Sequence, residues 1–457
     1  MRIRSIVVVA ALVMGCCAAS VAQRAGRPTP KADLDAQITA ALKDVSAAHI
    51  RANIEKLVSF GNRNTLSSND PALAQKGKGV VAARDWIRAE FERYSKECGG
   101  CLDVQLDTFV NDPADRIPKP TEISNVYAVL RGTSDPDRIY VVSGHYDSRN
   151  SDTLDIHAPA PGANDDGSGT AVSIECARVL SKRKFPATII FLTVAGEEQG
   201  LYGSRHFAQT AMSKGWKIDA VLNNDIVGGD RNKGQDPNIV RVFSEGVPTA
   251  ANEKDLRLIR ALGGENDSPS RQLARYVRET ARKYLPGRFG PKMVLRRDRY
   301  LRGGDHISFN EAGYAAVRFT EYREDHNHQH QNLRTENGIE YGDLPKFVDF
   351  DYVANVARLN AAVLASLASA PAAPGKVRLL TRNLENDSTI EWEASPAATG
   401  YEVLWRPTTA PEWENVEPVG NVTHAALPRS KDNVFFAVRS ADKQGHRSLP
   451  VVPEPER

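Results

Sequence analysis

One short segment constrains this chain more than any other: an apolar run that ends directly in two adjacent carboxylates. Residues 188–194 (TIIFLTV) have the continuous apolar character of a buried strand, and the sequence Ala-Gly-Glu-Glu follows at once. Adjacent carboxylates repel each other and are costly to remove from water. A neighbouring cation removes that cost, so Glu197 and Glu198 indicate a metal site with one ligand and one proton carrier.

Further acidic and imidazole groups stand where other predicted strands end. His145 and Asp147 follow the strand expected at residues 139–143, and their alternate spacing points both side chains to the same side. Asp165 lies in a glycine-flanked turn before a predicted helix, and Asp225 ends another apolar strand. The carboxyl ends of strands are where open α/β sheets bind ligands. Together these residues predict one metal site, with Asp147 supporting His145 from behind.

Strands and helices alternate through the middle of the chain. Apolar runs predict strands at residues 125–130, 139–143, 188–194, 220–225, 240–243 and 316–320. Apolar positions at helical spacing predict helices at residues 80–94, 168–182, 201–213 and 352–367. This alternation is typical of an α/β domain with a mostly parallel central sheet flanked by helices. We expect that catalytic domain to occupy residues 46–368.

The pattern changes to all-β after a linker at residues 369–375 (SAPAAPG). Short alternating strands are predicted at residues 388–393, 400–405 and 433–440, so residues 376–457 are expected to form a β-sandwich. This region resembles a fibronectin type III domain, because Trp392 fits its core tryptophan and Tyr401 its next aromatic. It carries no catalytic cluster, which favours a spacer or stabilising role. Contact with a polymer or a surface is the functional alternative.

The first residues are typical of a secretory signal peptide. Two arginines precede an apolar run at residues 6–14, and small residues follow as far as residue 22. The run is too short to span a membrane. We therefore expect a signal peptide at residues 1–22, a polar lead-in at residues 23–45, and a secreted or periplasmic protein. Lipidation at Cys16 is the less favoured alternative.

Cysteine usage and charge limit the remaining classes. In an exported protein, Cys98 and Cys101 are expected to form a local disulfide. Cys176 shares a helical face with Val172 and Val179, so we interpret it as ordinary core. The formal net charge is +2 and the basic residues are scattered, which gives no indication of nucleic-acid binding.

The order of these clusters resembles the bacterial leucine-aminopeptidase family of co-catalytic dizinc exopeptidases, from about residue 125 to residue 367. The resemblance implies two Zn²⁺ ions per chain, bridged by Asp165. It implies that His145 and Asp225 complete the ligands of one ion, while Glu198 and a late histidine complete those of the other. A cis peptide bond after the bridging aspartate is also implied.

The same resemblance assigns the remaining roles. It makes Glu197 the general base and Asp147 the partner that orients a ligand. The late histidine is assigned to His330, with His328 as the second choice. Tyr300 resembles a tyrosine that stabilises the oxyanion. Apart from the family resemblance, no segment of the sequence is apolar enough to predict a membrane span.

The resulting prediction is an exported aminopeptidase that hydrolyses N-terminal residues from peptides with a zinc-bound hydroxide and Glu197 as base. A carboxypeptidase or dipeptidase on the same metal core is the nearest alternative. A single-zinc glutaminyl cyclase is disfavoured by the presence of both His145 and Asp225. A non-catalytic binding or adhesion protein is disfavoured by the intact Glu197. The walls of the substrate pocket are expected from residues 229–299.

Overall fold

The computed structural model describes residues 34–456. The predicted signal peptide, Cys16 and the start of the lead-in lie outside the described residues. The rest of the lead-in contains helix α1 (Ala36–Asp44), whose N-terminus is capped by the Asp35 side chain. Ile38 and Leu42 of this helix are buried in the main core. Residues 36–44 are therefore packed structure and not only a polar lead-in. Although the segment is polar on average, its apolar residues lie on one face of α1 and pack into the core.

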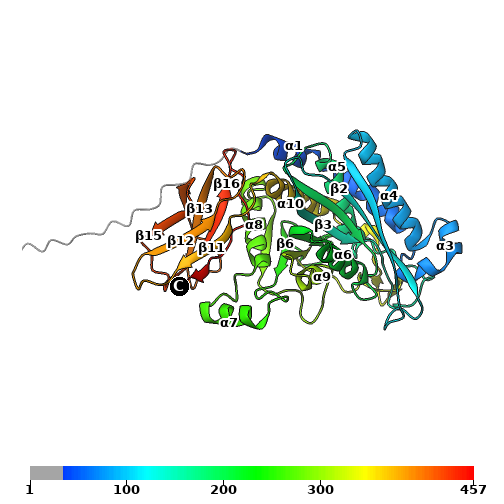
Figure 1. The fold of residues 1–457 in the computed structure, drawn as a ribbon. Helices are drawn as coiled ribbons and strands as arrows, with labels where there is room; N and C mark the ends of the chain where they lie inside the picture. Colours follow the sequence, from blue (N-terminus) through cyan, green and yellow to red (C-terminus); the bar gives the residue numbers. More distant parts are fainter. Residues whose placement is uncertain (1–33, 457) are drawn as a thin grey trace, which may run out of the picture. The chain divides into compact units, whose positions relative to one another are not determined.

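The central feature is an eight-stranded sheet (Figure 1). Its strands are β1 (Leu102–Asn111), β2 (Thr121–Leu130), β3 (Asp135–His145), β4 (Ala187–Val194), β5 (Lys217–Asn224), β6 (Ile239–Ser244), β7 (Gly290–Val294) and β8 (Ala316–Glu321). They lie in the order β1-β2-β4-β3-β5-β8-β6-β7. The centre, β4-β3-β5-β8, is parallel.

Four of the seven strand pairs are parallel, β6–β7 among them, so the sheet is mostly parallel as expected but includes antiparallel pairs. The pairs β1–β2, β2–β4 and β6–β8 are antiparallel. Residues 112–120 join β1 to β2 and are too few for the crossover that parallel neighbours need, so these strands must pair antiparallel. β1 and β7 were not predicted; β1 is half-exposed along its length, which hides a strand from a search for apolar runs.

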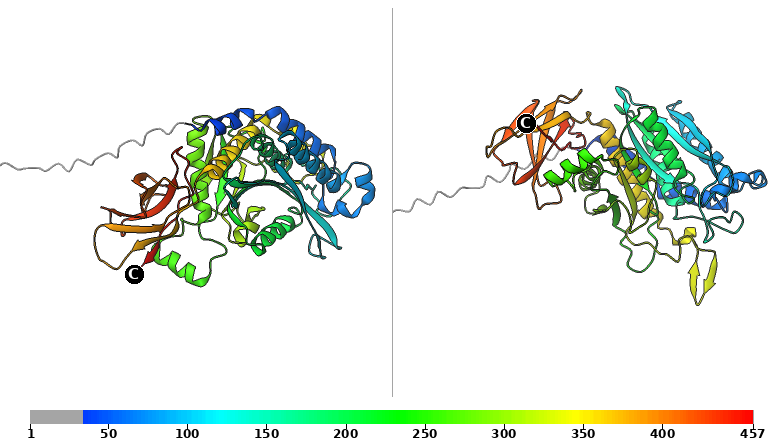
Figure 2. Two further views of the ribbon diagram at one scale, coloured as in Figure 1. Left: turned by 45° about the horizontal axis from the view of Figure 1, so that its top comes forward. Right: turned by 60° about the horizontal axis from the view of Figure 1, so that its bottom comes forward.

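Helices cover both faces of this sheet (Figures 1 and 2). One face packs against α2 (Ala47–Ser59), α4 (Gly79–Glu97), α5 (Gly167–Leu180), α8 (Pro269–Tyr284) and α10 (Phe350–Ser369). The other packs against α6 (Tyr202–Ser213) and α9 (His306–Glu311). Val142 contributes to the first core and Val141 to the second, as the alternation of side chains along a strand requires.

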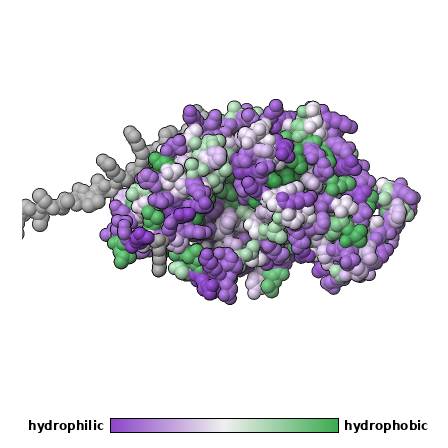
Figure 3. Space-filling model, viewed as in Figure 1, coloured by the Kyte–Doolittle hydropathy of each residue, from purple (hydrophilic) through white to green (hydrophobic). Residues whose placement is uncertain are grey.

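The remaining short elements connect these layers. They are η1 (Thr65–Asn69), α3 (Pro71–Gln75), α7 (Glu253–Leu262), β9 (Arg334–Glu336), β10 (Ile339–Tyr341) and η2 (Pro345–Phe347). Within residues 34–456, every helix is too short or too polar to cross a membrane. Hydrophilic side chains cover most of the face seen in Figure 3.

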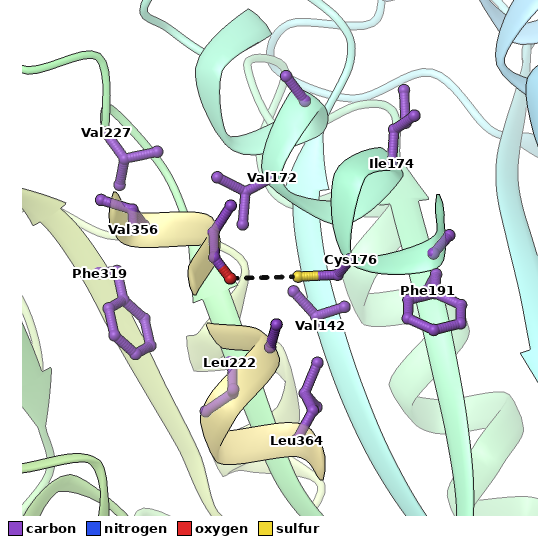
Figure 4. Close-up of a cluster of buried hydrophobic side chains, with 14 of the residues drawn as sticks. Val142, Val172, Ile174, Cys176, Phe191, Leu222, Val227, Phe319, Val356 and Leu364 are labelled. Carbon is purple, nitrogen blue, oxygen red and sulfur yellow. Dashed lines mark hydrogen bonds between the residues drawn. The ribbon is translucent and has the colours of Figure 1, made fainter. Parts of the chain in front are cut away.

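Both cysteine predictions are confirmed. Cys98 and Cys101 form a disulfide. Cys176 is a buried free thiol on α5, surrounded by side chains that include Val142 and Leu364 (Figure 4). Its Sγ lies 3.8 Å from the carbonyl oxygen of Ala357 on α10 (Figure 4). The thiol therefore acts as a small core residue between two helices.

The C-terminal region contains two further sheets. Their strands are β11 (Gly375–Leu380), β12 (Ser388–Glu393), β13 (Gly400–Pro407), β14 (Asn415–Gly420), β15 (His424–Leu427), β16 (Val434–Ala441) and β17 (Glu454–Glu456). One sheet has the order β15-β12-β11-β17 and the other β14-β13-β16. Trp392 from the first and Tyr401 from the second belong to one buried apolar cluster. The fibronectin type III assignment stays a prediction.

Buried ion pairs join this region to the segment around α8. Asp267 Oδ2 lies 2.7 Å from Arg406 Nη2 of β13, and Asp267 Oδ1 lies 2.9 Å from Arg275 Nη1 of α8. All three side chains are buried. The Trp413 indole also donates to Gln272 of α8, at 2.9 Å. Such contacts make the C-terminal region part of the folded body and argue against a freely tethered appendage.

Asp267→Asn should therefore destabilise the whole chain. The change leaves Arg275 and Arg406 buried without their shared carboxylate, and the loss of one partner of a buried pair costs about 3–5 kcal/mol. Urea unfolding measures this difference in the free energy of unfolding. Glu55→Gln, which breaks an exposed pair with Arg51, is the control and should cost about 0.5 kcal/mol or less. Equal unfolding midpoints for the two variants would contradict the structural role of Asp267.

The loop of residues 295–304 joins β7 to α9 and is held by a buried carboxylate. Glu324 Oε2 receives hydrogen bonds from Arg299 and Arg302, both at 3.0 Å. Burial opposes ionisation of Glu324, but Arg299 and the neighbouring guanidinium groups hold its pKa at about 2. Glu324 is therefore ionised in the folded chain well below its ordinary titration range.

This ion cluster predicts a pH-dependent contribution to stability. The ordinary pKa of 4.5 applies to the unfolded chain, so ionised Glu324 stabilises the fold above pH 4.5. We expect Glu324→Gln to lower the free energy of unfolding by about 3 kcal/mol at neutral pH. That difference should shrink as the pH falls below 4.5 and vanish near the folded pKa of about 2. Urea unfolding across this pH range tests the sign, and a constant difference would refute it.

Candidate metal centre

The residues predicted as ligands converge at the carboxyl ends of the parallel strands. His145 is the last residue of β3, Glu197 and Glu198 follow β4, and Asp225 follows β5. Asp165 precedes α5, and His330 lies in the loop after β8. Because β3, β4, β5 and β8 run in the same direction, their carboxyl ends share one edge of the sheet. The topology therefore gathers residues that are far apart in the sequence.

These side chains form two triads that share Asp165. His145, Asp165 and Asp225 form one triad, and Asp165, Glu198 and His330 form the other; in each, the ligand atoms lie within 4.8 Å of one another. Asp165 Oδ1 lies 3.2 Å from His145 Nε2, while Asp165 Oδ2 lies 2.9 Å from His330 Nε2. The two oxygens of one carboxylate thus face the two histidines, which is the geometry that a bridging ligand needs.

The donor set and its burial fit a pair of metal ions. The His145 side chain is 1% exposed, and its Nε2 has no hydrogen-bond partner among residues 34–456. Buried polar atoms without partners are costly unless a ligand completes them. Asp225 Oδ1 lies 4.0 Å from this nitrogen, too far for a direct hydrogen bond. Mixed imidazole and carboxylate ligands are those that zinc accepts.

Glu197 stands beside the triads without belonging to either. Its Oε2 lies 4.0 Å from His145 Nε2, and its side chain is 14% exposed. Burial, together with the charges of Asp225 and Glu198, raises the pKa of Glu197 well above its ordinary value, while His145 acts in the opposite direction. A partly accessible carboxylate with a raised pKa can accept and return a proton at neutral pH.

Asp147 lies behind His145, where the sequence analysis expects a supporting residue. His145 Nδ1 lies within hydrogen-bond distance of the backbone carbonyl oxygen of Asp147, at 3.2 Å, and 3.4 Å from its Oδ1. Asp147 Oδ2 accepts from the hydroxyl of Thr65 at 2.9 Å and from the backbone N–H of Glu198 at 3.3 Å. The carboxylate of Asp147 therefore holds the segment that carries Glu198, while its backbone carbonyl fixes the ring of His145.

The turn that carries Asp165 is held by residues that the sequence analysis missed. Asp343 accepts the backbone N–H groups of Asn164 and Asp165, each at 2.7 Å. The buried Arg63 donates from Nη2 to the carbonyl of Gly162 at 2.9 Å. The peptide bond after Asp165 is cis, as the family resemblance implies. No local pattern marks Arg63 or Asp343, because each acts on a turn more than 90 residues away.

Each triad also has an arginine on its unshared carboxylate. Arg149 Nε donates to Glu198 Oε2 at 2.9 Å. Arg318 Nη2 lies 2.7 Å from Asp225 Oδ1. Neither arginine was singled out in the sequence, where Arg149 only follows the His145 cluster and Arg318 lies inside a predicted strand. Each of these carboxylates is thus oriented by a cationic side chain.

Besides Glu197 and Asp147, which stand next to the triads, two other predicted residues lie outside them. Tyr300 is 75% exposed in the 295–304 loop, and its ring packs against the guanidinium of Arg296. His328 belongs to a separate group with Asp230 and Asp325, with its Nδ1 2.5 Å from Asp230 Oδ2. The geometry therefore selects His330 over His328 as the late histidine of the cluster.

Comparison with known proteins agrees with this cluster. The family model described as peptidase family M28 matches residues 125–350. A "probable zinc metalloprotease" of Pyrenophora teres f. teres is 47% identical over 428 residues, which are 92% of this chain and 87% of that protein. A "probable zinc metalloprotease" of Pyricularia oryzae is 48% identical over 433 residues, which are 92% of this chain and 85% of that protein.

Solved structures share the fold at lower identity. The Legionella pneumophila LapA aminopeptidase has a TM-score of 0.53 at 22% identity, covering 74% of this chain and 76% of that one. Legionella pneumophila LapB has a TM-score of 0.52 at 20% identity, covering 75% and 77%. At these identities the structures establish the fold, whereas the relatives of nearly full length establish the family. The chain belongs to peptidase family M28.

Proposed function

We propose that this protein is an exported aminopeptidase that holds two zinc ions and removes N-terminal residues from peptides. The observation that carries the proposal is the pair of triads that share Asp165. A single ion would need only one triad, whereas the two oxygens of Asp165 face separate histidines. The relatives named "probable zinc metalloprotease" support zinc as the metal.

The side chains around the cluster supply the rest of the reaction. The two triads would hold the zinc ions, which when bound would lower the pKa of water and polarise the scissile carbonyl. Glu197 takes a proton from the attacking water and returns it to the leaving amine. Asp165 sets the spacing of the two halves, and Asp147 keeps His145 in the orientation that presents Nε2. The family resemblance assigns stabilisation of the oxyanion to Tyr300, whose side chain is 75% exposed.

Export and the role of the C-terminal region complete the proposal. The signal-peptide pattern of residues 1–22 supports a secreted or periplasmic location. The exposed faces of the C-terminal sheets are available for contact with a polymer or a surface. The buried ion pairs at Asp267 additionally support a stabilising role.

Glu197→Gln should abolish turnover and leave metal binding intact. The amide cannot carry the proton, and general acid–base catalysis contributes about 10²- to 10⁴-fold. Hydrolysis of aminoacyl-nitroanilides and the zinc content of the dialysed protein provide the two measurements. Glu311→Gln, at an exposed position, is the matched control and should behave as the wild type. Retained turnover in the Glu197 variant would remove this residue from the role of base.

Histidine variants should separate the two halves of the site. His145→Ala and His330→Ala should each retain one zinc ion per chain, because each removes a ligand of only one triad. His328→Ala should retain two, since His328 belongs to a separate group. Metal analysis after dialysis distinguishes these outcomes. A loss of zinc from the His328 variant, with none from the His330 variant, would reverse the assignment.

Blocked dipeptides test the class of exopeptidase. An aminopeptidase requires the free α-amine, so we expect cleavage of C-blocked dipeptides and no cleavage of N-blocked ones. Chelation should abolish the activity, and added zinc should restore it. Cleavage of the N-blocked substrates alone would assign the site to a carboxypeptidase.

A further inference from the structure

Arg318 is a fully buried cation that lies between a predicted metal ligand and a distant loop. Its Nη2 lies 2.7 Å from Asp225 Oδ1, and its Nη1 lies 3.3 Å from Asp298 Oδ2. Nη1 also donates to the carbonyl of Gly303 at 2.7 Å. One guanidinium therefore joins the end of β5 to the 295–304 loop. Its side chain is 0% exposed, so water cannot replace any of these contacts.

The strand positions bring Arg318 to the metal centre. Arg318 of β8 is the Cα partner of Asn223 in β5, two residues before Asp225. The backbone N–H of Asp225 donates to the carbonyl of Phe319 at 3.1 Å. Asp225 is thus attached to β8 twice, through its backbone and through its carboxylate. The backbone contact places the residue, and the Arg318 contact sets the direction of its side chain.

The packing at this contact leaves no room for adjustment. A Cβ on Gly304 would lie 2.5 Å from Arg318 Nη1 and 3.1 Å from Asp225 Oδ2. The 295–304 loop therefore closes over the Arg318–Asp225 pair with a residue that has no side chain. Such a close approach of the backbone at Gly304 confines the Arg318–Asp225 contact.

The charges around Arg318 explain how a cation can support a metal site. Asp298 contacts Nη1 of the guanidinium while Asp225 contacts Nη2, and the two carboxylates balance its positive charge. Arginine presents its donors in a fixed planar fork, which can bind two carboxylates in a defined geometry. Lysine has one ammonium group and cannot hold the same partners in that arrangement. Position 318 therefore requires the planar guanidinium of arginine more than its positive charge.

We propose that Arg318 is a positioning residue that holds Asp225 in the orientation that completes the His145–Asp165–Asp225 triad. It couples that triad to the 295–304 loop through Asp298 and Gly303. This inference rests on the proposed function, because it requires a metal ion in that half of the site. The other half should be independent of Arg318, since its unshared ligand Glu198 is held by Arg149.

Zinc binding by Arg318→Lys tests the proposal, with Arg299→Lys as the matched control. Arg299 touches the same Asp298 carboxylate and donates to the same Gly303 carbonyl, but makes no hydrogen bond to Asp225. Metal-depleted full-length chains are titrated with Zn²⁺ against a competing chelator. We expect R318K to bind one ion with wild-type affinity and the other about 10- to 100-fold more weakly. R299K should bind both with wild-type affinity.

Repeating the titration in a chain that already carries His145→Ala identifies which half of the metal site Arg318 supports. In the His145→Ala chain only the Glu198 half remains, so adding R318K should leave the affinity of that single ion unchanged. A weakened ion in this background would overturn the proposal. So would equal losses in R318K and R299K, because the loop as a whole would then be responsible.

If R318K does not fold, the zinc affinity of Gly304→Ala tests the role of Arg318 instead. The added Cβ would crowd both Arg318 Nη1 and Asp225 Oδ2 and so disturb their contact without removing either residue, and the same selective weakening is expected. Wild-type affinity for both ions in folded G304A or R318K would overturn the role of Arg318. A wild-type chain that binds fewer than two ions at saturation would overturn the proposed function itself, and with it this inference. The two failures are thus distinguished by the wild-type titration.

Discussion

The structure depends on the burial of several carboxylates at one edge of a sheet. Asp165, Glu198 and Asp225 are almost fully removed from water, and each needs a positive or hydrogen-bonding partner to remain ionised there. Two histidines, two arginines and a set of backbone N–H groups supply part of that requirement. The orphaned Nε2 of His145 marks the part that the protein leaves for a metal.

The support of this site comes from segments well outside the ligand motifs. Arg63 and Asp343 hold the turn of Asp165, and Arg318 holds Asp225. Such outer contacts decide ligand orientation, and therefore metal affinity, as much as the ligands themselves. The C-terminal region follows the same principle on a larger scale, since the ion pairs at Asp267 join it to α8 through buried charges.

The sequence was most informative where chemistry is local. Continuous apolar runs located β4, β5 and β8, because buried parallel strands are apolar on both faces. It was least informative where an element lacks a clear apolar pattern. β1 and α7 were missed because they are partly or largely exposed, and α8 was missed because much of its buried face is polar or charged. The strand directions at the sheet edges were also missed, because they follow from which strands become neighbours and not from any one segment.

By itself, the sequence determined the residue types of the metal centre and their placement at strand ends. A carboxylate pair after an apolar strand can be interpreted from the local sequence alone, because the cost of removing it from water is a property of the side chains themselves. Only the tertiary structure decided that Asp165 faces two histidines, that His330 and not His328 completes the cluster, and that Tyr300 is exposed. It alone revealed Arg149 and Arg318, because long-range contacts depend on how strands and loops meet, which no local pattern encodes.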